Sequence, residues 1–107
     1  MLHAAPSTGR VVVDSGAAAA LQQRGASLLP SGVVRVEGSF GRGDTVEVVT
    51  DASPACSVIA KGITQYGSHD LERIGGRQSH EIEQVLGYVH APLVIHRDDL
   101  VLLESIA

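Results

Sequence analysis

The sequence predicts one small α+β domain, mainly β with short helices at its margin, built as a small barrel or sandwich. Several short runs of β-branched residues alternate with turn signals rich in Gly, Pro, Asp and Ser. The length of 107 residues suits a single domain. Aromatic residues supply only 3% of the chain, so Val, Leu, Ile and Ala must build the core.

The first strand is predicted at 10–13 (RVVV), and a helix is predicted to follow within GAAAALQQR. Asp14 or Ser15 can cap the amino end of this helix, because their side-chain oxygens accept from free backbone N–H groups. Gly25 can end it in the left-handed conformation. The face that we expect to lie on the sheet consists of Ala17, Ala20, Leu21 and Arg24.

Three further strands are predicted in the middle of the chain. Residues 33–36 follow a Pro-Ser-Gly turn, and 45–50 alternate so that Val46 and Val48 share one face. Residues 57–64 form the next strand, where Gly62 indicates a bulge or a close approach of the backbone.

Two short helices are predicted next, opened by Ser68 and Ser79 and ended by 75–76 and Gly87. Their apolar faces are Leu71 and Ile74 in the first and Ile82, Val85 and Leu86 in the second. Closing strands are predicted at 92–95 and 99–103, on either side of a corner at 96–99.

Charge and cysteine content limit the function classes. The net charge of −4 arises entirely from His69 onward, where seven acids face three arginines, so no whole-molecule field attracts nucleic acid. Arg24, Arg35 and Arg42 against Glu37 leave a weak local basic surplus. Cys56 is the only cysteine, which excludes an intrachain disulfide and fits the cytoplasm. No apolar run is long enough for a membrane span, and the start lacks the pattern of a secretory signal.

The triplet His96-Arg97-Asp98 matches the catalytic loop of protein kinases, but the supporting residues are missing. A protein kinase has an Asn five residues after the Asp, where this chain has Leu103, and the chain contains no Asn at all. Lys61 is its only lysine. We therefore predict that the triplet is not an active site.

Other catalytic and metal motifs are also incomplete. His96, Asp98 and Asp99 resemble a set of metal ligands, but successive strand residues point to opposite faces, so an Arg97–carboxylate pair with a turn-capping Asp is favoured. His80-Glu81 lacks the second His of a zinc motif, and no G-x-S-x-G elbow occurs. We predict neither catalytic residues nor metal ligands in this chain.

Longer segments of the chain resemble the carboxy-terminal PUA domain of the bacterial glutamate 5-kinase family. The segments that carry the resemblance are VVVDSGAAAALQQRGASLLPSGVVRVEGSFGRGDTVEVV, IAKGITQY, HDLERIGGRQSHEIEQVLGY and VIHRDDLVLL. Gln78 and Gly75 depart from the residues usual in that family. The resemblance implies a PUA-like pseudo-barrel over 10–104, with 1–9 as a linker remnant and 105–107 as a tail.

The resemblance also implies a parent enzyme that phosphorylates L-glutamate with ATP and magnesium, the first step of proline biosynthesis. Its kinase domain would precede the PUA domain, so we expect this chain to be an excised domain without catalysis or cofactor of its own. The leading hypothesis is a module that modulates activity or assembly of the parent. Its expected partners are the parent's kinase domain and, where it self-associates, further copies of itself.

The alternative hypothesis is an RNA-binding module. PUA domains of RNA-modifying enzymes bind RNA through the first helix and the entry to the following strand. Carried over by resemblance, the candidate residues are Arg24, Gly25, Ser27, Leu28, Leu29, Pro30 and Arg35. The acidic second half of the chain and the scarcity of aromatics for base stacking argue against RNA.

Overall fold

The computed structural model describes residues 9–50 and 58–102. Eight regular elements follow one another: β1 (Gly9–Val13), α1 (Ser15–Arg24), β2 (Val33–Gly38), β3 (Thr45–Thr50), β4 (Val58–Ile63), α2 (Ser68–Ile74), α3 (Ile82–Leu86) and β5 (Leu100–Leu102). Short 3₁₀ turns lie at Pro30–Gly32, Ser79–Glu81 and Arg97–Asp99. The predicted α+β class is confirmed.

The strands form one mixed sheet in the order β2-β1-β3-β4-β5. β1 is parallel to β3 and antiparallel to β2, while β3–β4 and β4–β5 are antiparallel. The first strand of the chain therefore lies inside the sheet. The pairing register shifts between Val12 and Val13 and between Val48 and Val49, and such bulges increase the local twist.

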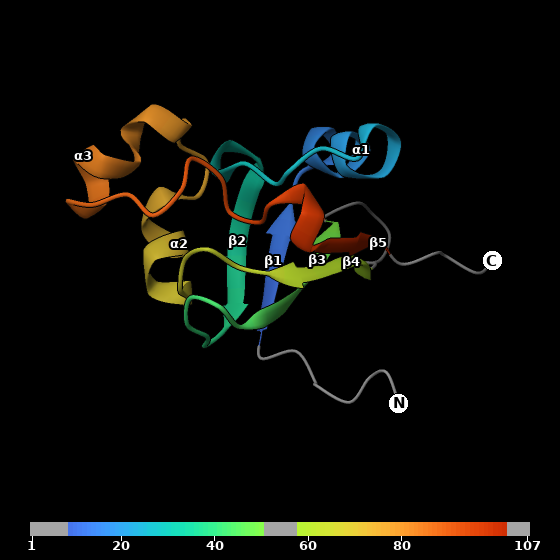
Figure 1. The fold of residues 1–107 in the computed structure, drawn as a ribbon, viewed down its shortest axis with the longest axis horizontal. Helices are drawn as coiled ribbons and strands as arrows, with labels where there is room; N and C mark the ends of the chain where they lie inside the picture. Colours follow the sequence, from blue (N-terminus) through green and yellow to red (C-terminus); the bar gives the residue numbers. More distant parts are fainter. Residues whose placement is uncertain (1–8, 51–57, 103–107) are drawn as a thin grey trace.

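The core lies between the inner face of the sheet and the helices. Alternate valines of the central strands point inward, as period-two patterning requires. In Figure 1, α1 covers the upper end of the sheet, α2 lies beside β2, and α3 packs on α2 farther from the sheet. The fully buried aliphatic residues at the centre include Val11, Val46, Val48, Leu21, Leu71, Ile74 and Ile82.

The predicted helix ends are confirmed where the signal is local. Asp14 caps α1, and Gly25 ends it with a φ of 63°. Gly87 ends α3 with a φ of 86°. Ser79 opens a 3₁₀ turn rather than the helix itself, so α3 begins at Ile82.

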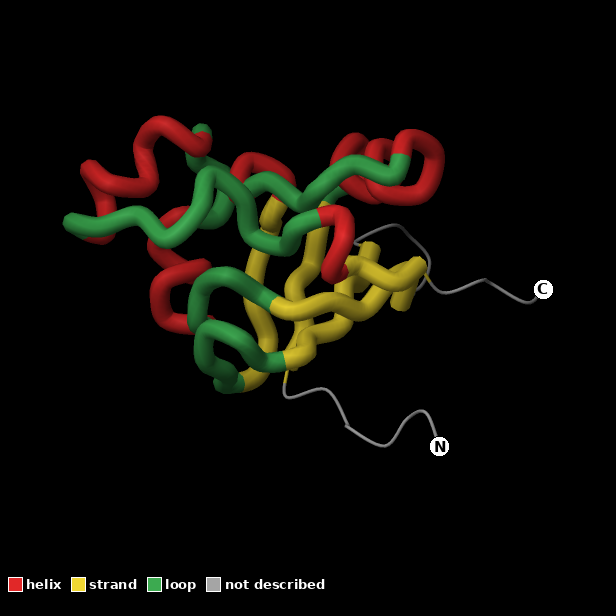
Figure 2. Tube along the Cα trace, viewed as in Figure 1, coloured by secondary structure: helices red, strands yellow, loops and turns green. Residues whose placement is uncertain are grey.

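The prediction of a strand at 92–95 is wrong. Ile95 makes only an isolated bridge with Leu28, and the Val94 N–H donates to the Leu28 carbonyl over 2.7 Å. This segment belongs to a long loop that crosses the molecule between α3 and β5 (Figure 2). Its backbone bonds are divided between Leu28, in the loop after α1, and the Gln65 N–H, which donates to the Val94 carbonyl over 2.8 Å, so no continuous strand ladder forms.

One buried side chain holds that loop in place. The hydroxyl of Tyr66, whose residue is fully buried, accepts from the backbone N–H groups of His90 and Ala91 over 2.9 and 3.0 Å. It donates to the Ala91 carbonyl over 2.5 Å. Three hydrogen bonds to one hydroxyl fix the start of the loop against the core.

Candidate functional site

A groove of about 320 Å³ lies between α1 and the segment 26–32 that follows it. The helix supplies small apolar side chains, and the segment supplies two leucines and two serines. The residues that line the groove are Asp14, Gly16, Ala17, Ala20, Leu21, Arg24, Ala26, Ser27, Leu28, Leu29, Ser31 and Gly32. The lining is therefore largely apolar, with a few polar side chains.

Short-range contacts set the position of α1 relative to this segment. The Ala17 N–H donates to Asp14 Oδ1 over 2.7 Å, which caps the helix. The Asp14 N–H donates to the Gly32 carbonyl over 3.0 Å and ties the helix start to the end of the 3₁₀ turn. A Cβ at Gly32 would lie 2.5 Å from Ala17 Cβ, so only glycine allows the turn to come this close.

The face of α1 that packs on the core differs from the predicted one. Ala18 and Leu21 are buried, with 6% and 1% of their surface exposed. Ala17 and Ala20 are only partly buried and Arg24 is exposed, and all three line the groove. The helix has alanines on every side, so its sequence does not distinguish the two faces. Of the predicted face, Leu21 is buried in the core and Ala17 packs against the core, whereas Arg24 is exposed.

Four of the seven candidate RNA-binding residues come together in the groove: Arg24, Ser27, Leu28 and Leu29. Leu28 is buried, whereas Leu29 is 48% exposed at the margin. Gly25 and Pro30 belong to the same segment without lining the groove.

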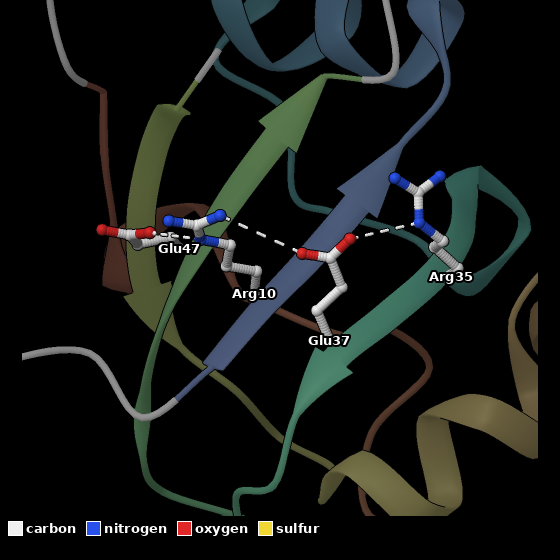
Figure 3. Close-up of polar contacts among 4 residues, drawn as sticks. All are labelled: Arg10, Arg35, Glu37 and Glu47. Carbon is white, nitrogen blue, oxygen red and sulfur yellow. Dashed lines mark hydrogen bonds and ion pairs between the residues drawn. The ribbon is translucent and has the colours of Figure 1, made fainter. Parts of the chain in front are cut away.

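Arg35 lies apart from the groove, on the outer face of the sheet. Its Nε is 3.2 Å from Glu37 Oε2, and Glu37 also faces Arg10 (Figure 3). Arg42 lies in the turn after β2, at the end of the sheet opposite α1. The three arginines of the sequence surplus therefore do not form one basic patch.

The His96-Arg97-Asp98 turn packs beside the groove, a contact that sequence reasoning missed. The Arg97 N–H donates to Ser27 Oγ over 2.9 Å, although 70 positions separate the two residues. The predicted Arg97–carboxylate pair is not found among the described residues. Instead His96 Nδ1 accepts from the Asp98 N–H over 3.1 Å and lies 3.5 Å from the Asp98 carboxylate. The motif serves as a structural turn that leads into β5.

Opposite charges stand at the two ends of α1 beside the groove. Asp14, which precedes the helix, has one carboxylate oxygen engaged by the Ala17 N–H. Arg24, its last residue, is exposed and makes no ion pair within the described ranges 9–50 and 58–102. The Arg24 guanidinium is thus the cationic group that the groove offers to a ligand.

A perturbed tyrosine lies away from the groove, at the α2–α3 end. The Tyr88 hydroxyl donates to Asp70 Oδ2 over 2.5 Å, and this hydrogen bond, with smaller effects of desolvation and the Asp70 charge, raises the pKa of Tyr88 above its usual 10.0. The folded state favours the neutral phenol. The stabilising effect of the Tyr88–Asp70 hydrogen bond is therefore present below pH 10.0 and is lost as the pH rises through the raised pKa of Tyr88.

We expect Asp70→Ala to lower the pKa of Tyr88, because the acceptor that favours the neutral phenol is removed. An alkaline titration of tyrosinate absorbance, compared between the variant and the unsubstituted chain, measures this change. Superimposable titration curves would show that the hydrogen bond does not control the ionisation.

Two further searches concern metal and membrane binding. Within the part of the chain that the structure describes, no three His, Cys, Asp or Glu side chains gather so that they could hold a metal ion. No helix in that same part is long and apolar enough to cross a bilayer. Cys56 lies outside the described residues.

Comparisons with known proteins agree with this geometry. The family model of the PUA domain matches residues 9–86. A glutamate 5-kinase from Salinibacter ruber is 61% identical over 101 residues, which cover 94% of this chain and 27% of that protein. A glutamate 5-kinase from Xanthomonas oryzae pv. oryzae is 52% identical over 101 residues, with 94% and 28% covered.

A solved structure supports the fold. A crystal structure of a PUA domain from Aeropyrum pernix K1, a tartrate complex, matches with a TM-score of 0.58 and 32% identity. The match covers 83% of this chain and 41% of that one. The chain spans about a quarter of the length of the curated relatives and is homologous to their carboxy-terminal part. The chain therefore belongs to the PUA domain family and resembles most specifically the PUA region of glutamate 5-kinases.

Proposed function

We propose that this chain is the non-catalytic accessory domain of a glutamate 5-kinase and modulates the activity or the assembly of that enzyme. The proposal is supported by the match to the Salinibacter ruber glutamate 5-kinase. The two sequences are 61% identical over a region that covers 94% of this chain but only 27% of the relative. The phosphorylation of L-glutamate with ATP and magnesium then belongs to the remaining three quarters of such a protein. A cytoplasmic location is part of the same proposal.

The test uses the Salinibacter ruber glutamate 5-kinase with this chain in place of its matching segment. Removal of the segment is expected to change the oligomeric state, the magnesium requirement or the inhibition by proline. Sedimentation and steady-state kinetics measure all three. The isolated chain, incubated with ATP, glutamate and magnesium, serves as the control and is expected to show no turnover. A truncated enzyme identical to the complete one in all three properties would contradict the proposal.

A second candidate function is RNA binding in the α1 groove. It is favoured by the exposed Arg24 guanidinium beside Ser27 and Leu29, which lie on the segment that the family resemblance points to. A phosphate contact from Arg24 would make binding salt-dependent, since each neutralised phosphate releases counterions.

The structure supplies a matched pair of arginine variants for this second function. Arg24→Ala is expected to weaken binding to structured RNA and to reduce the salt slope by about one. Arg35→Ala, on the sheet face beside Glu37, is expected to change binding far less. Titrations of both variants and of the unsubstituted chain with structured RNA, at low and at high salt, measure these effects. Undetectable binding at low salt, or equal effects of the two substitutions, would count against an RNA site in the groove.

A further inference from the structure

The outer face of the sheet carries a row of side chains that crosses all five strands. Neighbouring members of the row are paired in register from β2 to β5: Glu37, Arg10, Glu47, Lys61 and Val101. Because side chains alternate along a strand, this row points away from the core that contains Val11 and Val46. The charges alternate along the row, which ends in an apolar residue at the sheet edge.

Three of the four charged residues of the row, Glu37, Arg10 and Glu47, are already paired within the domain. Arg10 Nε lies 3.0 Å from Glu47 Oε1, and Arg10 Nη1 lies 4.0 Å from Glu37 Oε1 (Figure 3). The Arg10 and Glu37 side chains are 54% and 44% exposed. A surface that covered this row would not bury an unpaired carboxylate here, so the desolvation cost is lower than for isolated charges.

The row continues into an exposed apolar area on the same face. Val101 is 64% exposed beside Lys61, and Ile63, two residues after Lys61 on β4, is 41% exposed. Val12 and Val49 also belong to this face but are already buried. Exposed aliphatic side chains next to charged groups have the composition of a protein-docking surface with a polar rim.

The apolar area lies at the end of the sheet where the chain enters the domain. Gly9, the first residue of β1, is paired with Val46 of β3, and the adjacent Thr45 is paired with Ile63 of β4. Adjacent strands are about 4.8 Å apart, so Ile63 lies roughly 10 Å from the entering strand. In the curated relatives, about three quarters of the polypeptide lies outside the matched carboxy-terminal part and joins the domain through this strand.

We propose that Arg10, Glu37, Glu47, Lys61, Ile63 and Val101, here called the outer row, dock on the catalytic region that precedes the domain in a glutamate 5-kinase. The inference rests on the proposed function and adds the face through which the domain acts. A region tethered at Gly9 is held at high effective concentration beside this face, whereas a second copy of the chain has no such tether. The α1 groove then stays accessible, since it lies at the other end of the sheet.

The test follows the acetylation rate of Lys61, the only lysine of the chain. The acetylation rate of Lys61 is compared between the isolated domain and a Salinibacter ruber glutamate 5-kinase that carries this domain in place of its own PUA domain. Docking is expected to slow acetylation of Lys61 about tenfold, because a covered interface excludes the reagent. Equal rates in the two proteins would overturn the proposal. Slowing that depends on protein concentration would overturn it too, because it indicates a second copy instead.

Two double variants separate this surface from other exposed apolar residues. Ile63→Ser with Val101→Ser is expected to restore fast acetylation of Lys61 in the full-length protein. Leu29→Ser with Val34→Ser removes aliphatic residues of similar exposure, 48% and 47%, outside the outer row and is expected to leave the slow rate unchanged. Acetylation reports contact rather than activity. Fast labelling of the unsubstituted full-length protein, combined with a clear effect of domain removal on kinetics, would reject the surface and retain the proposed function.

Discussion

Replacing Tyr66 with Phe is expected to lower the free energy of unfolding by about 1–3 kcal/mol, the cost of leaving a buried polar group without its hydrogen-bond partner. The Tyr66 hydroxyl accepts from the N–H groups of His90 and Ala91 and donates to the Ala91 carbonyl. Phe keeps the ring but leaves these backbone groups without the hydroxyl. Denaturant unfolding measures the effect as a lower midpoint at constant slope.

Tyr88→Phe is the matched control for this prediction. Tyr88 is 42% exposed, and its hydroxyl makes one bond, to Asp70. Water can replace that partner, so we expect a clearly smaller loss than for Tyr66→Phe. A Tyr66→Phe variant no less stable than Tyr88→Phe would show that the hydroxyl does not hold the loop after α3.

Replacing Gly62 with Val is expected to cost about 1–3 kcal/mol, the usual range for overpacking in a well-packed site. A Cβ at this position would lie 2.7 Å from Ile95 Cγ2 and 3.0 Å from the Asp99 carbonyl oxygen. The carbonyl belongs to the backbone that leads into β5, and Gly62 itself is paired with Leu100. Relief of the clash therefore requires movement of β5. Thermal unfolding measures the loss.

Gly16→Ala is the control of opposite sign. Gly16 is exposed in α1, and an added Cβ would meet nothing nearer than Asp14 Oδ1 at 3.5 Å. Alanine favours a helix interior over glycine by about 1 kcal/mol, so this variant is expected to be as stable as the parent or slightly more stable. Similar losses at the two positions would contradict the steric interpretation of Gly62.

The ends of α1 and most of the strands were predictable because their signals are local. Asp14 and Gly25 encode the two ends of α1 within a few residues of the helix, and the fold class followed from short β-branched runs. Gly62 was predicted to mark a bulge or a close approach, and the structure shows the close approach. For these features, local backbone and side-chain preferences agree with the tertiary structure.

The candidate site was less predictable because long-range contacts build it. The bridge between Leu28 and Ile95 and the bond from Arg97 to Ser27 join segments far apart in the chain. Periodicity could not assign the faces of α1, where alanines surround the helix. Arg24 and Arg35 are close in sequence, yet one borders the groove and the other lies on the sheet. The family resemblance pointed to the segment 24–35. Only the structure shows which residues of that segment lie in one groove.

The interior position of β1 has a mechanical consequence. A load applied at Gly9 along the strand is shared between the ladder to β2 and the ladder to β3, so both sets of hydrogen bonds are sheared together instead of being unzipped one at a time. Anything attached ahead of this strand is anchored at the middle of the sheet. Such an attachment resists pulling far better than one made through the three-residue strand β5 at the margin.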